Sequence, residues 1–293
     1  MPSESAWTIQ RLLQWTTDFL RARGSASPRL DAEVLLAHAR DCQRIELYTA
    51  YDELATEELR SRFRDLVRQR SEGKPVAYLV GHREFYSLPF SVTPDVLIPR
   101  PETEHLVVEV LELAKNMLAP TAIADVGTGS GIIAVCCAKY LPDARVWATD
   151  ISTGALAVAA QNVSRHELQD RVTLLEGDLL TPIPADVTFD IIASNPPYVS
   201  RREYESLPVD VREYEPATAL VAGPTGAEII ARLVPQAADR LRPNGWFVCE
   251  LSPMICDHIL ALLEQEPRLH NVAVIPDLAG HRRVIRAQRV GEP

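Results

Sequence analysis

The chain has 293 residues and a formal net charge of −10, with 46% hydrophobic and 24% charged side chains. This balance is typical of a globular protein, and the length is sufficient for two domains and at least one sizeable core. No apolar run approaches the roughly 20 residues that a membrane-spanning helix needs, so we expect no membrane partner. The first residues, Met-Pro-Ser-Glu-Ser, also lack the basic region of a signal peptide.

The cysteines give no sign of a disulfide framework or a metal site. Their number is odd, and they form no C-x-x-C motif or Cys/His cluster. We expect them to be small buried hydrophobic residues in a reducing compartment, and the protein to be cytoplasmic and free of metal. They are Cys42, Cys136, Cys137, Cys249 and Cys256.

The negative charge is concentrated in the second part of the chain. Residues 1–77 hold 12 Lys and Arg against 12 Asp and Glu, whereas the rest hold 18 against 28. An acidic surface is a poor match for a nucleic-acid backbone. We therefore expect no direct nucleic-acid partner.

Residues 1–76 are predicted to form a helical domain. Apolar residues recur at helical spacing from residue 9 to 20, and Gly24 follows as a stop. Ser27 and Pro28 are typical of a helix start, and Thr56 is a candidate cap for a further helix. On that last helix Arg60, Arg64 and Arg68 share one face, which is either a solvated face or a docking surface for a partner.

Residues 77–101 are predicted to be a linker with the character of a hairpin. The segments 77–80, 84–86 and 90–92 have the composition of short strands separated by turns. Prolines then flank Arg100 on both sides, before a predicted helix at 103–116. This stiff turn either leads into the helix or directs the Arg100 cation toward a site.

Residues 102–293 alternate predicted strands and helices, as in an α/β domain. A strand at 122–126, a glycine loop and an apolar helix at 132–140 would let a ligand approach bare backbone amides. The loop is G-x-G-x-G and lacks the last glycine of the dinucleotide fingerprint. Its residues are Gly127, Thr128, Gly129, Ser130 and Gly131.

Asp150 ends the next predicted strand, 23 residues after Gly127. An acidic side chain at this place accepts hydrogen bonds from ribose hydroxyls. The alternative is that Asp150 caps the helix predicted at 152–163. After a third strand, at 172–175, Asp178 is positioned to accept from an adenine amino group and Leu179 to cover a flat ring.

The fourth strand, 189–194, ends in Asn195-Pro196-Pro197-Tyr198. The prolines hold the backbone rigid just past the carboxyl end of the strand, where open α/β sheets bind ligands. The Asn195 side-chain carbonyl and the backbone carbonyl of residue 196 can accept both hydrogens of a planar –NH2 group, with the ring of Tyr198 beside it. The alternative is a simple Asn-Pro turn. Together with a nucleoside loop at the same sheet edge, this motif predicts N-methylation that depends on S-adenosylmethionine.

The remaining segments complete the predicted sheet. Residues 199–224 are expected to be a long polar loop that acts as a lid over the substrate. Further on, a turn at 241–245 leads into a strand at 246–250. We then expect a helix at 255–266 and two closing strands, at 272–275 and 283–287.

Over nearly its whole length the chain resembles the peptide chain release factor N5-glutamine methyltransferases. The resemblance rests on motifs at 83–86, 97–104, 125–131, 194–198 and 215–216. The chain departs from the family at Leu251-Ser252-Pro253-Met254, where a glycine and later a glutamine are usual. It departs again at Gly280-His281-Arg282-Arg283, where Gly-Arg-Asp-Arg is usual. Neither departure touches the residues assigned to the chemistry.

The resemblance implies a seven-stranded, Rossmann-like class I methyltransferase sheet with an N-terminal helical bundle. It implies S-adenosylmethionine as cofactor and, as substrate, the glutamine of a Gly-Gly-Gln motif in release factors. The glycine loop would then take the methionine part of the cofactor, Asp150 the ribose, and Asp178 and Leu179 the adenine. Asn195 to Tyr198 would hold the glutamine amide. We expect a monomer.

Three other functions are compatible with these motifs. A ribosomal-protein glutamine methyltransferase would share all the chemistry. A nucleic-acid adenine or cytosine methyltransferase shares the Asn-Pro-Pro-Tyr motif but needs a basic, aromatic-lined cleft for a flipped base. A non-catalytic cofactor-binding module would need no reactive Asn195 at all.

Overall fold

The computed structural model describes residues 7–117 and 121–291, so the expectation drawn from the first five residues lies outside the described residues. By its internal contacts the chain forms two compact units. The helical unit comprises Met1–Gly81 and Val209–Tyr214, and the sheet unit comprises His82–Pro208 and Glu215–Pro293. Within the described ranges no helix has both the length and the apolar character needed to cross a membrane.

The helical unit is built as its caps and apolar spacing predict. The Thr8 hydroxyl accepts from the Arg11 amide at 3.2 Å, and the Thr56 hydroxyl accepts from the Leu59 amide at 3.2 Å, so two helices start on threonine caps. A core of buried leucines and of Phe63 lies between the helices. The helices are α1 (Ile9–Ala22), α2 (Pro28–Arg40), α3 (Glu46–Thr49), α4 (Glu57–Ser71) and α5 (Val76–Val80), with α10 (Val209–Arg212) from the later segment.

The prediction of a strand at 77–80 is wrong, because these residues form helix α5. A short apolar run has no periodicity that separates a strand from a helical turn. The residues at the two ends of this segment favour the helix. Pro75 precedes the helical turn with φ −58°, and Gly81 closes it in the left-handed region with φ +77°. The Gly81 amide donates to the Ala77 carbonyl at 2.8 Å.

The predicted hairpin is present as strands β1 (His82–Phe85) and β2 (Leu88–Ser91), which pair antiparallel. Its two-residue turn needs positive φ at Tyr86 and Ser87, which have φ 50° and 59°. The Tyr86 amide donates to a carboxylate oxygen of Glu104 at 2.9 Å, which holds this turn in place. Next come the 3-10 turn η1 (Pro101–Thr103) and helix α6 (Glu104–Ala114).

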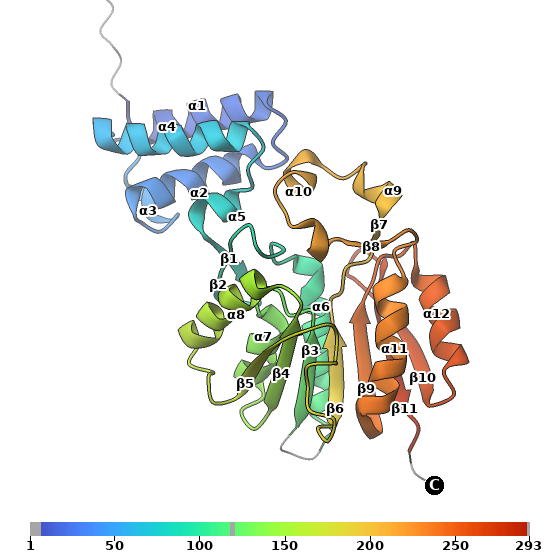
Figure 1. Cartoon of the computed structure of the whole chain (residues 1–293). Coiled ribbons are helices and arrows are strands. Elements are labelled where there is room, and N and C mark those ends of the chain that lie inside the picture. Colours follow the sequence, from blue (N-terminus) through green and yellow to red (C-terminus); the bar gives the residue numbers. More distant parts are fainter. Residues whose placement is uncertain (1–6, 118–120, 292–293) are drawn as a thin grey trace, which may run out of the picture. The chain divides into compact units, whose positions relative to one another are not determined.

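The sheet has seven strands in the order β10-β11-β9-β6-β3-β4-β5 (Figure 1). Strands β9, β6, β3, β4 and β5 are parallel, and β11 joins β9 antiparallel with β10 outside it. The strands are β3 (Ala122–Val126), β4 (Arg145–Asp150), β5 (Val172–Glu176), β6 (Phe189–Ser194), β9 (Leu241–Glu250), β10 (Leu269–Pro276) and β11 (Arg282–Arg289).

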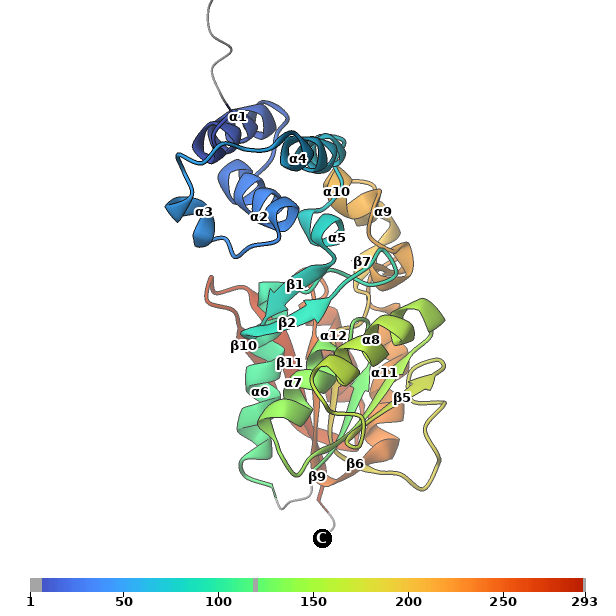
Figure 2. The same ribbon diagram turned by 90° about the vertical axis from the view of Figure 1, so that its left-hand side faces the viewer.

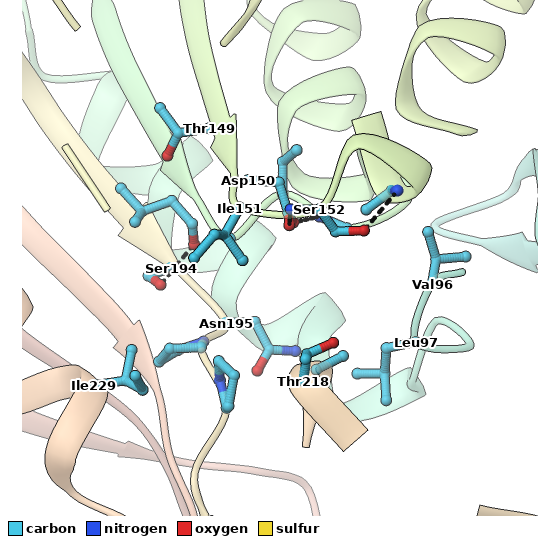
Figure 3. A pocket seen from close by; sticks show the side chains of 18 of the residues that line it. Val96, Leu97, Thr149, Asp150, Ile151, Ser152, Ser194, Asn195, Thr218 and Ile229 are labelled. Carbon is cyan, nitrogen blue, oxygen red and sulfur yellow. Dashed lines mark hydrogen bonds between the residues drawn. The ribbon is translucent and has the colours of Figure 1, made fainter. Parts of the chain in front are cut away.

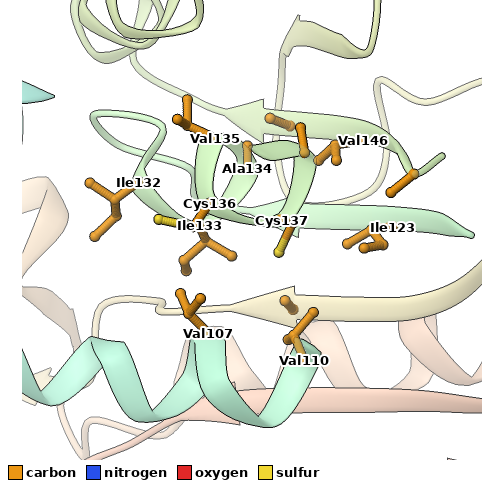
Figure 4. Close-up of a cluster of buried hydrophobic side chains, with 14 of the residues drawn as sticks. Val107, Val110, Ile123, Ile132, Ile133, Ala134, Val135, Cys136, Cys137 and Val146 are labelled. Atoms are coloured by element: carbon orange, nitrogen blue, oxygen red, sulfur yellow. The ribbon is translucent and has the colours of Figure 1, made fainter. Parts of the chain in front are cut away.

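Helices cover both faces of this sheet (Figure 2). Alternate strand residues divide between two cores, as the period of a strand requires: Ile123 packs with α6 and α7, whereas Ala122 and Ala124 pack with α11 and α12. Figure 4 shows Val107 and Val110 of α6 facing the core that contains Ile123. The covering helices are α6, α7 (Ile132–Tyr140) and α8 (Thr153–Arg165) on one face and α11 (Glu228–Arg240) and α12 (Cys256–Gln265) on the other.

Two further expectations need correction. The predicted turn at 241–245 is part of β9, although Asn244 has φ +65° and the pairing with β6 shifts register there. The segment 199–224 is not a structureless loop but holds several short elements. They are β7 (Val199–Ser200), α9 (Arg201–Tyr204), α10, η2 (Ala217–Ala219) and β8 (Val221–Gly223), and β7 pairs with β8.

Residues 209–214 belong to the helical unit. The Tyr214 hydroxyl donates to the Glu72 carbonyl at 3.0 Å, and a side-chain carbon built on Gly73 would lie 3.4 Å from the Tyr214 ring. A segment that the sequence assigns to the second domain therefore packs as part of the first unit.

Candidate active site

A pocket of about 310 Å³ lies in the sheet unit, lined largely by residues that follow the carboxyl ends of β3, β4, β5 and β6. This is the edge at which open α/β sheets bind ligands. Gly131 and Tyr198 are predicted site residues that do not line it. The predicted residues that do are Gly127, Thr128, Gly129, Ser130, Asp150, Asp178, Leu179, Asn195, Pro196 and Pro197.

The glycine loop leaves open space where other residues would place a side chain. Gly127 and Gly129 have φ +73° and +55°, and a side-chain carbon built on either would meet nothing within 4 Å. Gly131 serves packing instead, because such a carbon would lie 3.3 Å from Ala159 of α8. The loop is thus a backbone cradle that fits a ligand pressed against its amides.

Asp150 binds the loop and faces the pocket. Its Oδ2 accepts from the Gly129 amide at 2.8 Å, and its Oδ1 accepts from the Ser152 amide at 2.9 Å. The cap of α8 is Ser152, not Asp150, since the Ser152 hydroxyl accepts from the Ala155 amide at 3.1 Å. Each carboxylate oxygen retains a further lone pair, so Asp150 can also accept hydrogen bonds from the hydroxyls of a ribose.

A second carboxyl group, Asp125 at 0% exposure, lies beneath the loop and was not predicted as a site residue. Its Oδ2 accepts from the Thr128 hydroxyl at 2.6 Å and from the Ala134 amide at 3.0 Å. Burial raises the pKa of Asp125 to about 7, although both hydrogen bonds lower it. The sequence does contain a signal that could have identified Asp125, namely an aspartate inside an apolar strand. Burying such a carboxyl group costs free energy unless hydrogen bonds compensate for the lost hydration.

Asp178 and Leu179 lie beside each other on the pocket wall. The Asp178 carboxylate forms an ion pair with Arg232 of α11, another lining residue. Leu179 has φ +54°, an uncommon conformation for a residue with a branched side chain. The predicted adenine acceptor is therefore already engaged by a cation.

Asn195 lies across the pocket from Asp150 and Ser152 (Figure 3). The preceding residue is fixed to the neighbouring strand, because the Ser194 hydroxyl donates to the Val126 carbonyl at 2.7 Å. The Asn195 Nδ2 donates to the Thr103 hydroxyl at 3.1 Å, and among the described residues no hydrogen bond to Asn195 Oδ1 is present, so this oxygen is an available acceptor. Tyr198 instead directs its hydroxyl to Glu250, to which it donates at 3.1 Å.

Arg100 lines the pocket and pairs with Glu215. The second oxygen of Glu215 accepts from the Ile98 amide at 3.1 Å. Two motifs far apart in the sequence therefore meet at the pocket wall. Thr103 and Glu250 were not predicted as site residues. Thr103 looked like an ordinary residue of the turn that leads into a helix, and Glu250 looked like the ordinary last residue of a core strand.

The helical unit has a hollow of its own, of about 590 Å³, between α1 and α4. The exposed Trp15 stacks on Phe19 at its rim, with 5.1 Å between ring centroids. Arg60 and Arg64 pair with Glu57, and Arg68 with Asp65, so the arginine face carries its own ion-pair partners. That pairing favours a solvated face, although the same three arginines line the hollow.

The fold is that of a class I methyltransferase. The hMettl16 catalytic domain, solved in complex with MAT2A 3′UTR hairpin 1, has a TM-score of 0.57 and 18% identity, covering 72% of this chain and 77% of that one. The family model "Methyltransferase small domain" matches residues 103–209, and the "PrmC N-terminal domain" model matches residues 11–81.

Curated relatives extend this likeness to the whole chain. The release factor glutamine methyltransferase of Rhodopirellula baltica is 54% identical, over 98% of either chain. That of Koribacter versatilis is 40% identical, over 95% of this chain and 97% of its own. The chain therefore belongs to the release factor glutamine methyltransferase family and is an S-adenosylmethionine-dependent methyltransferase.

Proposed function

We propose that this enzyme methylates the side-chain amide nitrogen of the glutamine in the Gly-Gly-Gln motif of peptide chain release factors. The observation that carries the proposal is the orientation of Asn195. Its Nδ2 is engaged by Thr103, so its Oδ1 is the acceptor available to a substrate –NH2 group, in the pocket that also contains the glycine cradle. The names of the relatives support the same substrate.

Methyl transfer requires the chain to hold the methyl donor and to orient the substrate amide. S-adenosylmethionine supplies an electrophilic methyl group on a sulfonium, and the cradle of Gly127 and Gly129 with Asp150 holds it. Asn195 Oδ1 and the Pro196 carbonyl accept the two amide hydrogens, which directs the nitrogen lone pair along the line of transfer. These hydrogen bonds strengthen as the nitrogen becomes pyramidal, and they therefore favour the transition state over the ground state.

The proton balance needs no dedicated base. As the amide nitrogen forms its bond to the methyl group, the bond from sulfur to that methyl breaks and its electron pair stays on sulfur. The methylated nitrogen is strongly acidic and loses one hydrogen to water. Tyr198 is not a base in this scheme, because burial raises the pKa of its hydroxyl, as does the nearby Glu250 carboxylate. A metal ion has no role in it.

The release factor is thus the proposed partner, with no nucleic acid or membrane required and the enzyme acting as a monomer. Mass spectrometry of a purified release factor, after incubation with this protein and S-adenosylmethionine, tests the proposal. We expect a gain of one methyl on the Gly-Gly-Gln glutamine, and none with Asn195→Ala.

The same experiment separates the alternatives. No gain with the cofactor still bound would overturn the proposal, and ribosomal proteins and then nucleic acid would be tried as substrates. A non-catalytic cofactor-binding module would keep its biological role in the Asn195→Ala variant, whereas an enzyme would bind cofactor and lose turnover.

A further inference from the structure

We propose that Gln236 of α11 is a positioning residue for cofactor binding, which holds Leu179 at the pocket by fixing the peptide group that follows it. The inference rests on the proposed cofactor site, in which Asp178 and Leu179 take the adenine. Gln236 itself does not line the pocket, so it can act there only through the residues that do.

Leu179 has a backbone conformation that is unfavourable for a leucine. Its φ of +54° lies in the left-handed region, where the side-chain carbon crowds the backbone. A glycine would avoid this cost, but it would place no side chain on the pocket wall. Such a conformation persists only where the surrounding structure fixes the backbone. The peptide groups before and after Leu179 therefore have to be held in place.

The peptide group before Leu179 is held from within the turn. Its carbonyl belongs to Asp178, and it accepts from the Thr181 amide at 3.1 Å and from the Thr181 hydroxyl at 2.6 Å. These two bonds do not involve the peptide group that joins Leu179 to Leu180.

Gln236 holds the peptide group after Leu179. The amide of this group belongs to Leu180, and it donates to Gln236 Oε1 at 3.2 Å. The Leu180 side chain is 2% exposed and belongs to the core that α11 covers, which brings its amide within reach of the helix. With the preceding group held, Leu179 can leave its positive φ only if the following group turns. That turn would break the bond to Gln236.

The carboxamide of Gln236 is itself oriented by the helix. Its Nε2 donates to the backbone carbonyl of Arg232, one turn earlier in α11, at 3.2 Å. The Leu180 amide is a donor and needs an acceptor, which the Oε1 end supplies. Because the donor end is bound to the backbone of a regular helix, the acceptor end has a fixed place beside the pocket wall.

Arg240 provides a matched control on the same helix. It lies one turn after Gln236, and its guanidinium donates to the carbonyls of Val187 at 2.9 Å and Pro184 at 2.5 Å. These carbonyls belong to the same connection between β5 and β6, but their residues do not line the pocket. Loss of Arg240 should therefore loosen the connection without releasing Leu179, which separates a positioning role from a purely structural one.

Calorimetry with S-adenosylhomocysteine tests the inference without any methyl acceptor. Gln236→Met keeps the length of the side chain but removes the accepting oxygen, and should raise the Kd by about three- to tenfold, the range expected for one hydrogen bond. Arg240→Met should keep the Kd within about twofold of wild type. In the release factor assay, the KM for S-adenosylmethionine should rise by the same factor as the Kd, with kcat unchanged. Gln236→Leu takes the place of Gln236→Met if the methionine variant does not fold.

The double variant Gln236→Met/Leu179→Gly shows whether Gln236 acts through Leu179. Leu179→Gly should weaken binding because the cover over the adenine ring is lost, whereas glycine adopts a positive φ without strain. Loss of Gln236 should then have no further effect, so the double variant should bind as Leu179→Gly does. Multiplying losses would overturn the inference, as would an unchanged Kd in Gln236→Met or an equal rise in Arg240→Met. A wild type that does not bind S-adenosylhomocysteine would instead contradict the proposed cofactor site.

Discussion

Arg100 and Glu215 form an ion pair although 115 residues separate them in the sequence. The Glu215 side chain is 1% exposed, whereas the Arg100 side chain is 33% exposed and lines the pocket. Glu215 also accepts from the Ile98 amide, so one buried carboxylate fastens the proline-flanked turn from two sides. The pair thus fixes the pocket wall through a residue that does not itself line the pocket.

Arg100→Ala should therefore destabilise the protein. Removing the cation from a buried carboxylate is costly, but water can reach the exposed third of Arg100, so we expect a loss of about 1–3 kcal/mol in the free energy of unfolding. Urea unfolding measures it. Arg21→Ala, which breaks an exposed pair with Asp18, is the matched control and should cost less than about 0.5 kcal/mol.

A double-mutant cycle with Glu215→Gln isolates the interaction between the two side chains. A coupling energy of at least about 1 kcal/mol is expected. A coupling indistinguishable from zero would mean that Arg100 contributes only its packing.

Gly129→Ala should weaken cofactor binding more than it destabilises the fold. The positive φ of Gly129 costs an alanine about 1 kcal/mol, and the added methyl group would project into the open space of the cradle. We expect the Kd for S-adenosylhomocysteine to rise by tenfold or more, measured by calorimetry. Gly280→Ala is the matched control, because Gly280 has φ +83° and equally open surroundings but does not line the pocket. Equal Kd values for the two variants would argue against the cradle.

Variants of Asp178 and Arg232 test the prediction that Asp178 accepts a hydrogen bond from adenine. They separate this role from the ion pair between the two side chains. A hydrogen bond to a charged acceptor contributes roughly 1.5 kcal/mol, so Asp178→Ala should weaken S-adenosylhomocysteine binding about tenfold. Arg232→Ala removes the cation but leaves the carboxylate, and should change the Kd by less than about twofold. Equal losses in both variants would show that the ion pair, and not an acceptor for adenine, is what matters.

The sequence predicts those parts of the site that are marked by a motif of neighbouring residues. Asp150 ends a strand, and the glycine loop and Asn195 each follow one directly, so parallel strand ends bring them to one pocket. Thr103 and Glu250 escaped prediction because their hydrogen bonds join elements far apart in the chain. Nothing in the sequence around Thr103 or Glu250 indicates that the side chain forms a hydrogen bond with a residue far away in the chain.

Local errors had local causes. Residues 77–80 are too few and too apolar for their periodicity to show a helix, and only the flanking Pro75 and Gly81 indicate one. By contrast, the packing of 209–214 against Glu72 and Gly73 depends on a long-range tyrosine contact that no local sequence pattern encodes.

Asp125 should make the stability of the protein depend on pH. Its pKa of about 7 lies above the value of about 3.9 for an exposed aspartate, because burial disfavours the charged form. Between these values the folded protein binds more protons than the unfolded chain. The stability that this group contributes is therefore fully present below about pH 4 and is lost as the pH rises to about 7.

Asp125→Asn removes the titrating group but keeps an oxygen that can accept from the Thr128 hydroxyl and the Ala134 amide. The free energy of unfolding of the variant, relative to wild type, should therefore rise by on the order of 2–3 kcal/mol between pH 5 and pH 8. Urea unfolding at several pH values gives this difference, and the carboxyl 13C shift of Asp125 gives the titration itself. A difference that is constant across this range would show that Asp125 is already ionised at pH 5, held charged by Thr128 and Ala134 in spite of its burial.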